Sequence, residues 1–193
     1  MARSRSLKDV PTLVFGAGRD CTLPAVLALA TGTEYEWIMG VSGAAFTSTI
    51  DADTWDPLAA APLDETTLAR GALAAGARPD IVGPPFDDDM RALILDRVAE
   101  AIDAKLPPLV RGIAGPAEYG LIVGYDDDGP TFLARPYFDK TDRPTKIDWS
   151  AFADAEHGLV AFLDRGPAPD RNALARDAVR GALALPCILQ QLG

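Results

Sequence analysis

The chain has 193 residues, of which 48% are hydrophobic and 24% are charged, a composition typical of one folded domain with an apolar core. Its formal net charge of -10 predicts repulsion from phosphate backbones and acidic membranes, so neither nucleic acid nor a membrane is expected as a partner. No stretch approaches the roughly 18 apolar residues of a membrane span, and residues 1–11 lack the apolar segment of a secretory signal. The predicted location is therefore cytoplasmic.

The N-terminal part of the chain predicts a strand and then helices. Residues 1–11 are expected to be a flexible N-terminus, and the apolar residues 12–16 indicate a short buried strand. Asp20 is the predicted N-cap of a helix that carries Cys21 at its start and ends at Gly32. Residues 34–46 suggest a strand, a glycine-rich bend and a second apolar segment.

Two more helices are expected in the middle of the chain. The first spans residues 64–76, which begin with acidic residues. The second begins at three aspartates, residues 87–89, and places Met90, Ile94 and Val98 on one stripe. Because carboxylates at a helix N-terminus interact favourably with the helix dipole, we interpret the aspartates as a cap and first turn and not as a metal site.

The pattern changes after two prolines at 107 and 108. Four segments are predicted strands, and residues 126–129 form a turn signal between two of them; the strands are 109–113, 119–126, 131–138 and 158–164. Helices followed by a mostly antiparallel sheet indicate the α+β class in one domain, residues 1–193. The helical residues 170–193 end without an obvious stop, which predicts either a homo-oligomer interface or a truncated extension.

The chain has two cysteines, Cys21 and Cys187, and one histidine, His157. The wide separation of the cysteines predicts free thiols in a reducing compartment. No spacing typical of metal ligands occurs, so neither a metal nor a cofactor is expected. His157 lies between acidic residues and an apolar strand, which favours a solvated position at the start of that strand over a catalytic role.

Cys21 is the last residue of the glycine-rich segment GAGRDC (16–21), at the start of the predicted helix. A dinucleotide-binding turn is disfavoured, because Cys21 replaces the third glycine of that pattern and no βαβ unit follows. A thiol at a helix N-terminus can be stabilised as a thiolate, and the free N–H groups there suit an oxyanion. A small buried residue fits the same position. The position alone therefore leaves a nucleophile and a packing residue open.

Three further segments carry a family resemblance. The Asp20–Cys21 pair opening a helix, the segment IMGVSGAAF (38–46) and the segment GPAEYGLIVGYDDDG (115–129) resemble papain-like cysteine peptidases, in particular the bacteriocin-processing type and the N-terminal domain of butirosin biosynthesis protein H. The resemblance covers residues 12–165. It implies a helical half that carries the cysteine, packed on an antiparallel sheet. It also implies acyl transfer or amide cleavage through Cys21, with a small molecule, a peptide or an acyl carrier as substrate.

The chain departs from that pattern at both assisting positions. Glu118 stands where the family has its histidine base, and Arg135 stands where it has the orienting acid. The resemblance therefore places Glu118 and Arg135 on adjacent strands, where they are predicted to form an ion pair. A carboxylate beside Cys21 is expected to raise the pKa of the thiol.

Two functions centred on Cys21 remain open from the sequence, besides a third, an interaction subunit that assembles through residues 170–193. One is an enzyme with Cys21 as nucleophile and Glu118 as an unusual base. The other is a papain-like domain that has lost turnover and binds a small polar molecule or a peptide end. For the second function the predicted ligand-binding residues are Ser42, Gly43, Tyr119 and Arg135.

Overall fold

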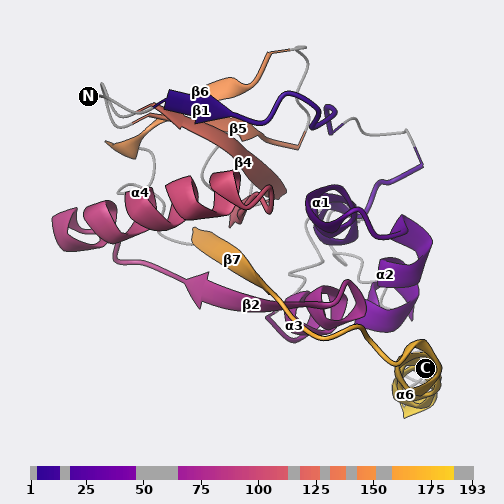
Figure 1. The fold of residues 1–193 in the computed structure, drawn as a ribbon. Helices are drawn as coiled ribbons and strands as arrows, with labels where there is room; N and C mark the ends of the chain where they lie inside the picture. Colours follow the sequence, from indigo (N-terminus) through magenta and orange to yellow (C-terminus); the bar gives the residue numbers. More distant parts are fainter. Residues whose placement is uncertain are drawn as a thin grey trace, which may run out of the picture.

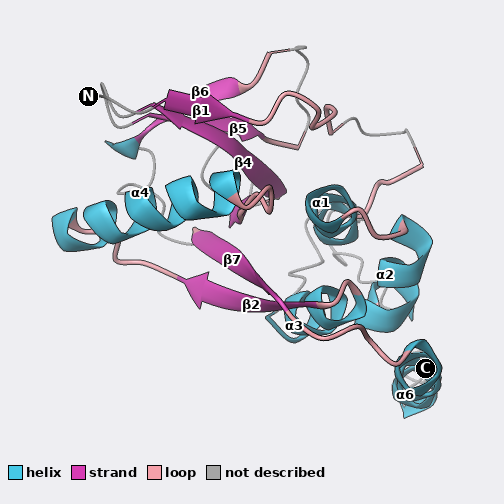
Figure 2. Cartoon of the chain, in the orientation of Figure 1, coloured by secondary structure: helices cyan, strands magenta, loops and turns pink. Residues whose placement is uncertain are grey.

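A computed structural model describes most of the chain, in the ranges 4–13, 18–46, 65–112, 118–126, 131–137, 143–150 and 158–184. Within these ranges α-helices combine with one antiparallel sheet of seven strands (Figures 1 and 2), which confirms the α+β class. The helices are α1 (Thr22–Thr31), α2 (Tyr35–Ser42), α3 (Glu65–Ala74), α4 (Asp88–Asp103) and α6 (Arg171–Ala184), with a short 3-10 helix, η1 (Ala44–Phe46).

The sheet has the order β2-β7-β3-β4-β5-β6, and β1 pairs with the second half of β4. All of its pairings are antiparallel. Its strands are β1 (Ser4–Ser6), β2 (Ala77–Val82), β3 (Leu109–Arg111), β4 (Tyr119–Asp126), β5 (Thr131–Arg135), β6 (Thr145–Asp148) and β7 (Leu159–Arg165).

Successive strand residues contribute to two different cores. Leu121 packs in a cluster with α1 and α3, whereas its neighbour Ile122 packs in a cluster with α4. Leu109 and Val110 divide in the same way. This alternation is what a strand buried on both faces requires, because side chains point to opposite faces with a period of two. Figure 1 accordingly shows α4 and the group of α1, α2 and α3 as separate packing units.

The predicted helices are confirmed where the chain carries clear start and stop signals. Helix α1 ends at Gly32, which has the left-handed φ of 73° that glycine tolerates. Helix α4 begins after Asp87, whose side chain accepts a hydrogen bond from the Met90 N–H at 3.0 Å. Its buried residues Ile94, Val98 and Ile102 form the predicted stripe. Helices α3 and α6 also lie where the sequence places them.

Residues 34–46 contradict the sequence prediction of a strand and a bend. They form α2 and η1, and Ile38, Val41 and Ser42 are buried at the i, i+3 and i+4 spacing of a helix. Alternation of charged and aromatic residues at the start of the segment imitates the period of a strand. The left-handed Gly43, with φ 91°, ends the helix.

The structure also adds strands that the sequence did not predict. Residues 4–6, within the segment expected to be flexible, form β1, and the strands β2 and β6 were missed. Helices therefore do not simply precede the sheet, because β1 and β2 belong to the first half of the chain. Within the predicted strand 12–16, residues 12 and 13 are not in a strand. The rest of that strand, and most of the turn at 126–129, lie outside the described residues.

Helix α6 packs against α2 by partly buried side chains only. The Arg171 guanidinium lies 4.3 Å from the centre of the Trp37 ring, and it also pairs with Glu34 at 3.5 Å. Val179 and Leu183 are exposed on its outer side. The homo-oligomer interface predicted for residues 170–193 stays a prediction.

Candidate functional site

Cys21 is the N-cap of α1, and its carbonyl oxygen accepts the first helical hydrogen bond, from the Ala25 N–H at 3.1 Å. The sequence placed the cap one residue earlier, at Asp20. The thiol makes no capping hydrogen bond, and Pro24 in the first turn has no N–H to offer. Cys21 is a partly buried residue at this helix end.

Glu118 lies directly before β4 and reaches the same helix end. Its Oε2 accepts a hydrogen bond of 2.6 Å from the Thr22 hydroxyl. The side chain of Thr22 is buried, so this bond joins the sheet to the first residue of α1. The negative carboxylate also lies at the positive end of the α1 dipole, which stabilises it there. Cys21 and Glu118 are therefore neighbours, as the sequence analysis proposed.

Two tyrosines complete the surroundings of the thiol. The Cys21 N–H donates to the Tyr35 hydroxyl oxygen at 3.2 Å, and the Tyr137 hydroxyl donates to the Asp20 carbonyl at 3.2 Å. Sequence reasoning did not single out Tyr35 or Thr22. The sequence analysis assigned Tyr35 to a strand. The helical spacing of Ile38, Val41 and Ser42 after it would have indicated a helix that begins at Tyr35.

The titration behaviour of the cluster follows from burial and negative charge. Burial, and then the Glu118 carboxylate, raise the pKa of the Cys21 thiol to about 11. Burial and nearby negative groups, Asp20 first among them, raise the pKa of Tyr137 to about 12. The pKa of Tyr35 is raised as well, chiefly by burial. The thiol and both hydroxyls are therefore protonated at neutral pH, so each can donate a hydrogen bond.

Arg135 is buried at the end of β5 and lies opposite Leu121 in the register. Directly opposed residues share a face, so Arg135 is on the α1 side of the sheet. Glu118 is three residues before Leu121, roughly 10 Å along a strand. The Glu118 carboxylate accepts a hydrogen bond from Thr22. The Glu118–Arg135 ion pair stays a prediction.

Tyr119 is buried in the α1 core, next to Glu118 in the chain and opposite Arg111 in the register. The Arg111 guanidinium lies 5.7 Å from the centre of its ring. Tyr119 thus connects the neighbourhood of Cys21 with the end of β3.

Ser42 and Gly43 lie at the far end of α2 from Tyr35. The Ser42 hydroxyl donates to the Met39 carbonyl and accepts from the Ala44 N–H, so it serves the end of its own helix. Its Cβ would lie 3.5 Å from a side chain added at Gly71 of α3. The contacts of Ser42 are therefore those of helix packing, and its predicted ligand-binding role stays a prediction.

Two residues weighed in the sequence analysis, His157 and Cys187, lie outside the described residues. Among the parts of the chain that the structure describes, no helix combines the length and apolar character needed to cross a membrane.

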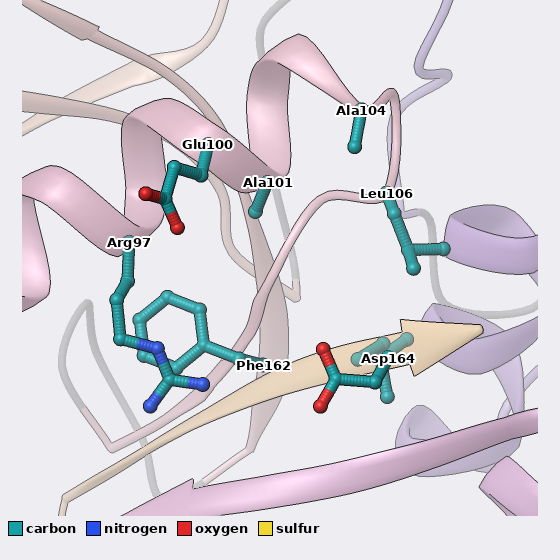
Figure 3. Close-up of a pocket in the computed structure, with 8 residues that line it drawn as sticks. Arg97, Glu100, Ala101, Ala104, Leu106, Phe162 and Asp164 are labelled. Atoms are coloured by element: carbon teal, nitrogen blue, oxygen red, sulfur yellow. The ribbon is translucent and has the colours of Figure 1, made fainter. Parts of the chain in front are cut away.

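A small cavity of about 150 Å³ lies between α4 and β7 (Figure 3). The Arg97 guanidinium there lies 4.0 Å from the centre of the Phe162 ring and pairs with Asp80 of β2 at 2.7 Å. The Arg97 side chain therefore connects α4 to Asp80 of β2 and to Phe162 of β7, and its charge is already paired.

Comparisons with known proteins identify no relative. No family model, no curated protein and no solved structure matches the chain.

Proposed function

We propose that this chain is a papain-like domain that binds a ligand at the N-terminus of α1 and does not turn over substrate through Cys21. The sequence resemblance and the α+β arrangement support the fold. The surroundings of the thiol support the binding role. Its central observation is that Glu118, the residue at the position of the base, is hydrogen-bonded to Thr22, and that burial, and then the Glu118 carboxylate, raise the pKa of the Cys21 thiol to about 11.

Nucleophilic catalysis by cysteine needs the opposite arrangement. The thiolate is the attacking species, and cationic partners or a nearby base lower the pKa of catalytic thiols. A negative carboxylate beside Cys21 disfavours the thiolate instead. In addition, the Cys21 N–H, which would otherwise be free to stabilise an oxyanion, is bonded to Tyr35.

The polar groups of the cluster suit a ligand that brings hydrogen-bond donors. The Glu118 carboxylate accepts hydrogen bonds and attracts positive charge, and the neighbouring hydroxyls both donate and accept. A protonated amine or a hydroxyl-bearing small molecule fits this chemistry, and so does the amino end of a peptide. Arg135, on the α1 side of the sheet, keeps the ligand-binding role that the sequence analysis predicts for it.

The alternative is acyl transfer through Cys21 with Glu118 as base. It is favoured by one observation, the position of the partly buried Cys21 at the N-terminus of a helix. An activated ester separates the two functions, because a competent nucleophile forms an acyl-enzyme faster than it releases it.

The test mixes the full chain with p-nitrophenyl acetate at neutral pH and follows nitrophenolate release and intact mass. We expect no stoichiometric burst and no acetyl group on Cys21, with Cys21→Ser behaving like the unmodified chain. Circular dichroism confirms that both proteins are folded. A burst that disappears in Cys21→Ser would overturn the binding proposal and establish the acyl-transfer function.

A further inference from the structure

A larger cavity of about 450 Å³ lies away from Cys21, where three strands and α3 come together. Its volume is within the range of about 300–1,000 Å³ typical of small-molecule sites. Neither Cys21 nor Glu118 lines it. The lining comes from the start of α3, the end of β2 with the two residues after it, the end of β3 and the start of β7; it comprises Glu65, Ile81, Gly83, Pro84, Arg111, Gly158 and Leu159.

Of the described residues that line this cavity, one carries a positive and one a negative side chain. Arg111 is partly buried, and its guanidinium rests near the ring of Tyr119, which limits the orientations that it can adopt. Glu65 is the exposed first residue of α3. Among the described residues no ion pair joins Glu65 to Arg111, although both line the same space.

The remaining wall is largely apolar. Ile81, Pro84 and Leu159 provide aliphatic surface, and Gly83 and Gly158 leave space beside it. An aliphatic group placed there would be removed from water, which contributes about 25 cal/mol for each Å² buried.

We propose that this cavity binds a small zwitterion of the α-amino-acid class with an aliphatic side chain. The ligand carboxylate is held by Arg111, whose planar guanidinium suits two parallel hydrogen bonds to a carboxylate. The ligand ammonium group is held by Glu65, and the side chain covers the aliphatic wall. A ligand with a single charge leaves one of the two protein charges unmatched.

The cavity of Figure 3 does not support the same inference. It is about a third of the volume, and its arginine is already paired with Asp80.

The experiment titrates the full chain with L-leucine by calorimetry. Two analogues of similar shape are compared: 4-methylpentanoate, which lacks the ammonium group, and isoamylamine, which lacks the carboxylate. We expect leucine to bind at least about tenfold more tightly than either analogue, a difference of about 1.4 kcal/mol. Arg111→Gln and Glu65→Gln should each weaken leucine binding by at least the same factor.

Matched controls are Arg78→Gln and Glu100→Gln, which remove exposed charges outside the cavity and should leave the affinity for leucine unchanged. No leucine binding up to ~10 mM overturns the proposal. The proposal is also overturned if either analogue binds as tightly as leucine, or if Glu65→Gln binds leucine as tightly as the unmodified chain. If Arg111→Gln fails to fold, the analogue series and the exposed Glu65→Gln decide the question. Because Cys21 is not part of this cavity, the result is independent of the ester test.

Discussion

At the scale of single residues, the thiol of Cys21 is under opposing influences. The dipole of α1 favours a negative charge at the helix N-terminus, whereas burial and the Glu118 carboxylate favour the neutral thiol. The pKa of about 11 shows that burial and Glu118 dominate. Because Glu118 itself lies at the end of the helix, the negative charge that the dipole attracts is supplied by the carboxylate and not by the sulfur.

The sequence predicted this neighbourhood only in part. The resemblance to papain-like peptidases brought Cys21 and Glu118 together, since positions so far apart in the sequence cannot be related by local periodicity. It did not indicate that Thr22 would hold the carboxylate. Tyr35 was missed because its helix was predicted as a strand. The Glu118–Arg135 pair stays a prediction, because the register that aligns Arg135 with Leu121 could not be read from the sequence.

The hydrogen bond between Thr22 and Glu118 predicts a stability effect. Thr22→Val keeps the shape of the buried side chain and removes the donor. We expect a loss of about 1–2 kcal/mol in the free energy of unfolding, measured by urea denaturation, because hydrogen bonds to charged groups contribute at this level. Thr145→Val, on the exposed edge strand β6, is the control and should change stability by less than about 0.5 kcal/mol. Equal losses for Thr22→Val in the wild-type and Glu118→Ala backgrounds would contradict the bond.

At the scale of elements, predictions succeeded where a segment carries its own periodicity and end signals. The aspartate cap and buried stripe of α4 are local features, and so is the glycine that ends α1. Strands β1, β2 and β6 are short or lie at the edge of the sheet, and their pairing depends on partners far away in the chain. Strand β2 contains Pro79. Proline is generally unfavourable within a sheet, but it is tolerated in a strand at the edge of the sheet, where β2 lies.

The pairing of β1 with β4 predicts that Gly124 cannot carry a side chain. A Cβ at this position would lie 2.6 Å from the Arg5 carbonyl oxygen and 2.9 Å from the Ser6 Cβ. We expect Gly124→Ala to detach β1 and to lower the free energy of unfolding by about 1–3 kcal/mol, the range for overpacking. Hydrogen exchange should also accelerate at the Leu7 N–H, which donates to the Val123 carbonyl at 2.8 Å.

The control for Gly124→Ala is Gly40→Ala within α2. Nothing lies within 4 Å of a Cβ added at Gly40, and alanine favours helix, so this variant should be neutral or more stable. Unchanged exchange at Leu7 in Gly124→Ala would show that β1 does not pair with β4 in solution.

At the scale of the whole molecule, the cysteine site is part of a fold whose single sheet has a helix-covered core on each face. Strands β3, β4 and β7 contribute side chains to both cores, so the elements around Cys21 and those around α4 share the same strands. The α+β class could be predicted because it follows from the order and type of segments. The contact between α1 and the start of β4 needed the structure, because it depends on how the helices pack on the sheet.

Alkaline pH should lower the stability of the whole chain through this site. The ordinary pKa of a cysteine thiol is 9.0, whereas the pKa of Cys21 in the folded chain is about 11. As the pH rises, the unfolded chain therefore loses the Cys21 proton first. The stabilising contribution is therefore complete below pH 9 and is lost as pH rises through about 11. We expect the free energy of unfolding of Cys21→Ser to fall less steeply between these values, measured by urea denaturation at several pH values. Parallel curves for the two proteins would contradict the raised pKa.

The central claim, that Cys21 is a neutral thiol held beside Glu118, is tested most directly by the pH dependence of its alkylation. The full chain is treated with iodoacetamide over a range of pH, and modification of Cys21 is followed by peptide mass spectrometry, with folding checked at each pH. We expect the rate of Cys21 alkylation to rise with an apparent pKa of about 11. This apparent pKa should be lower in Glu118→Gln and unchanged in Glu100→Gln. An apparent pKa at or below the ordinary thiol value of 9.0, or one unmoved by Glu118→Gln, would contradict it.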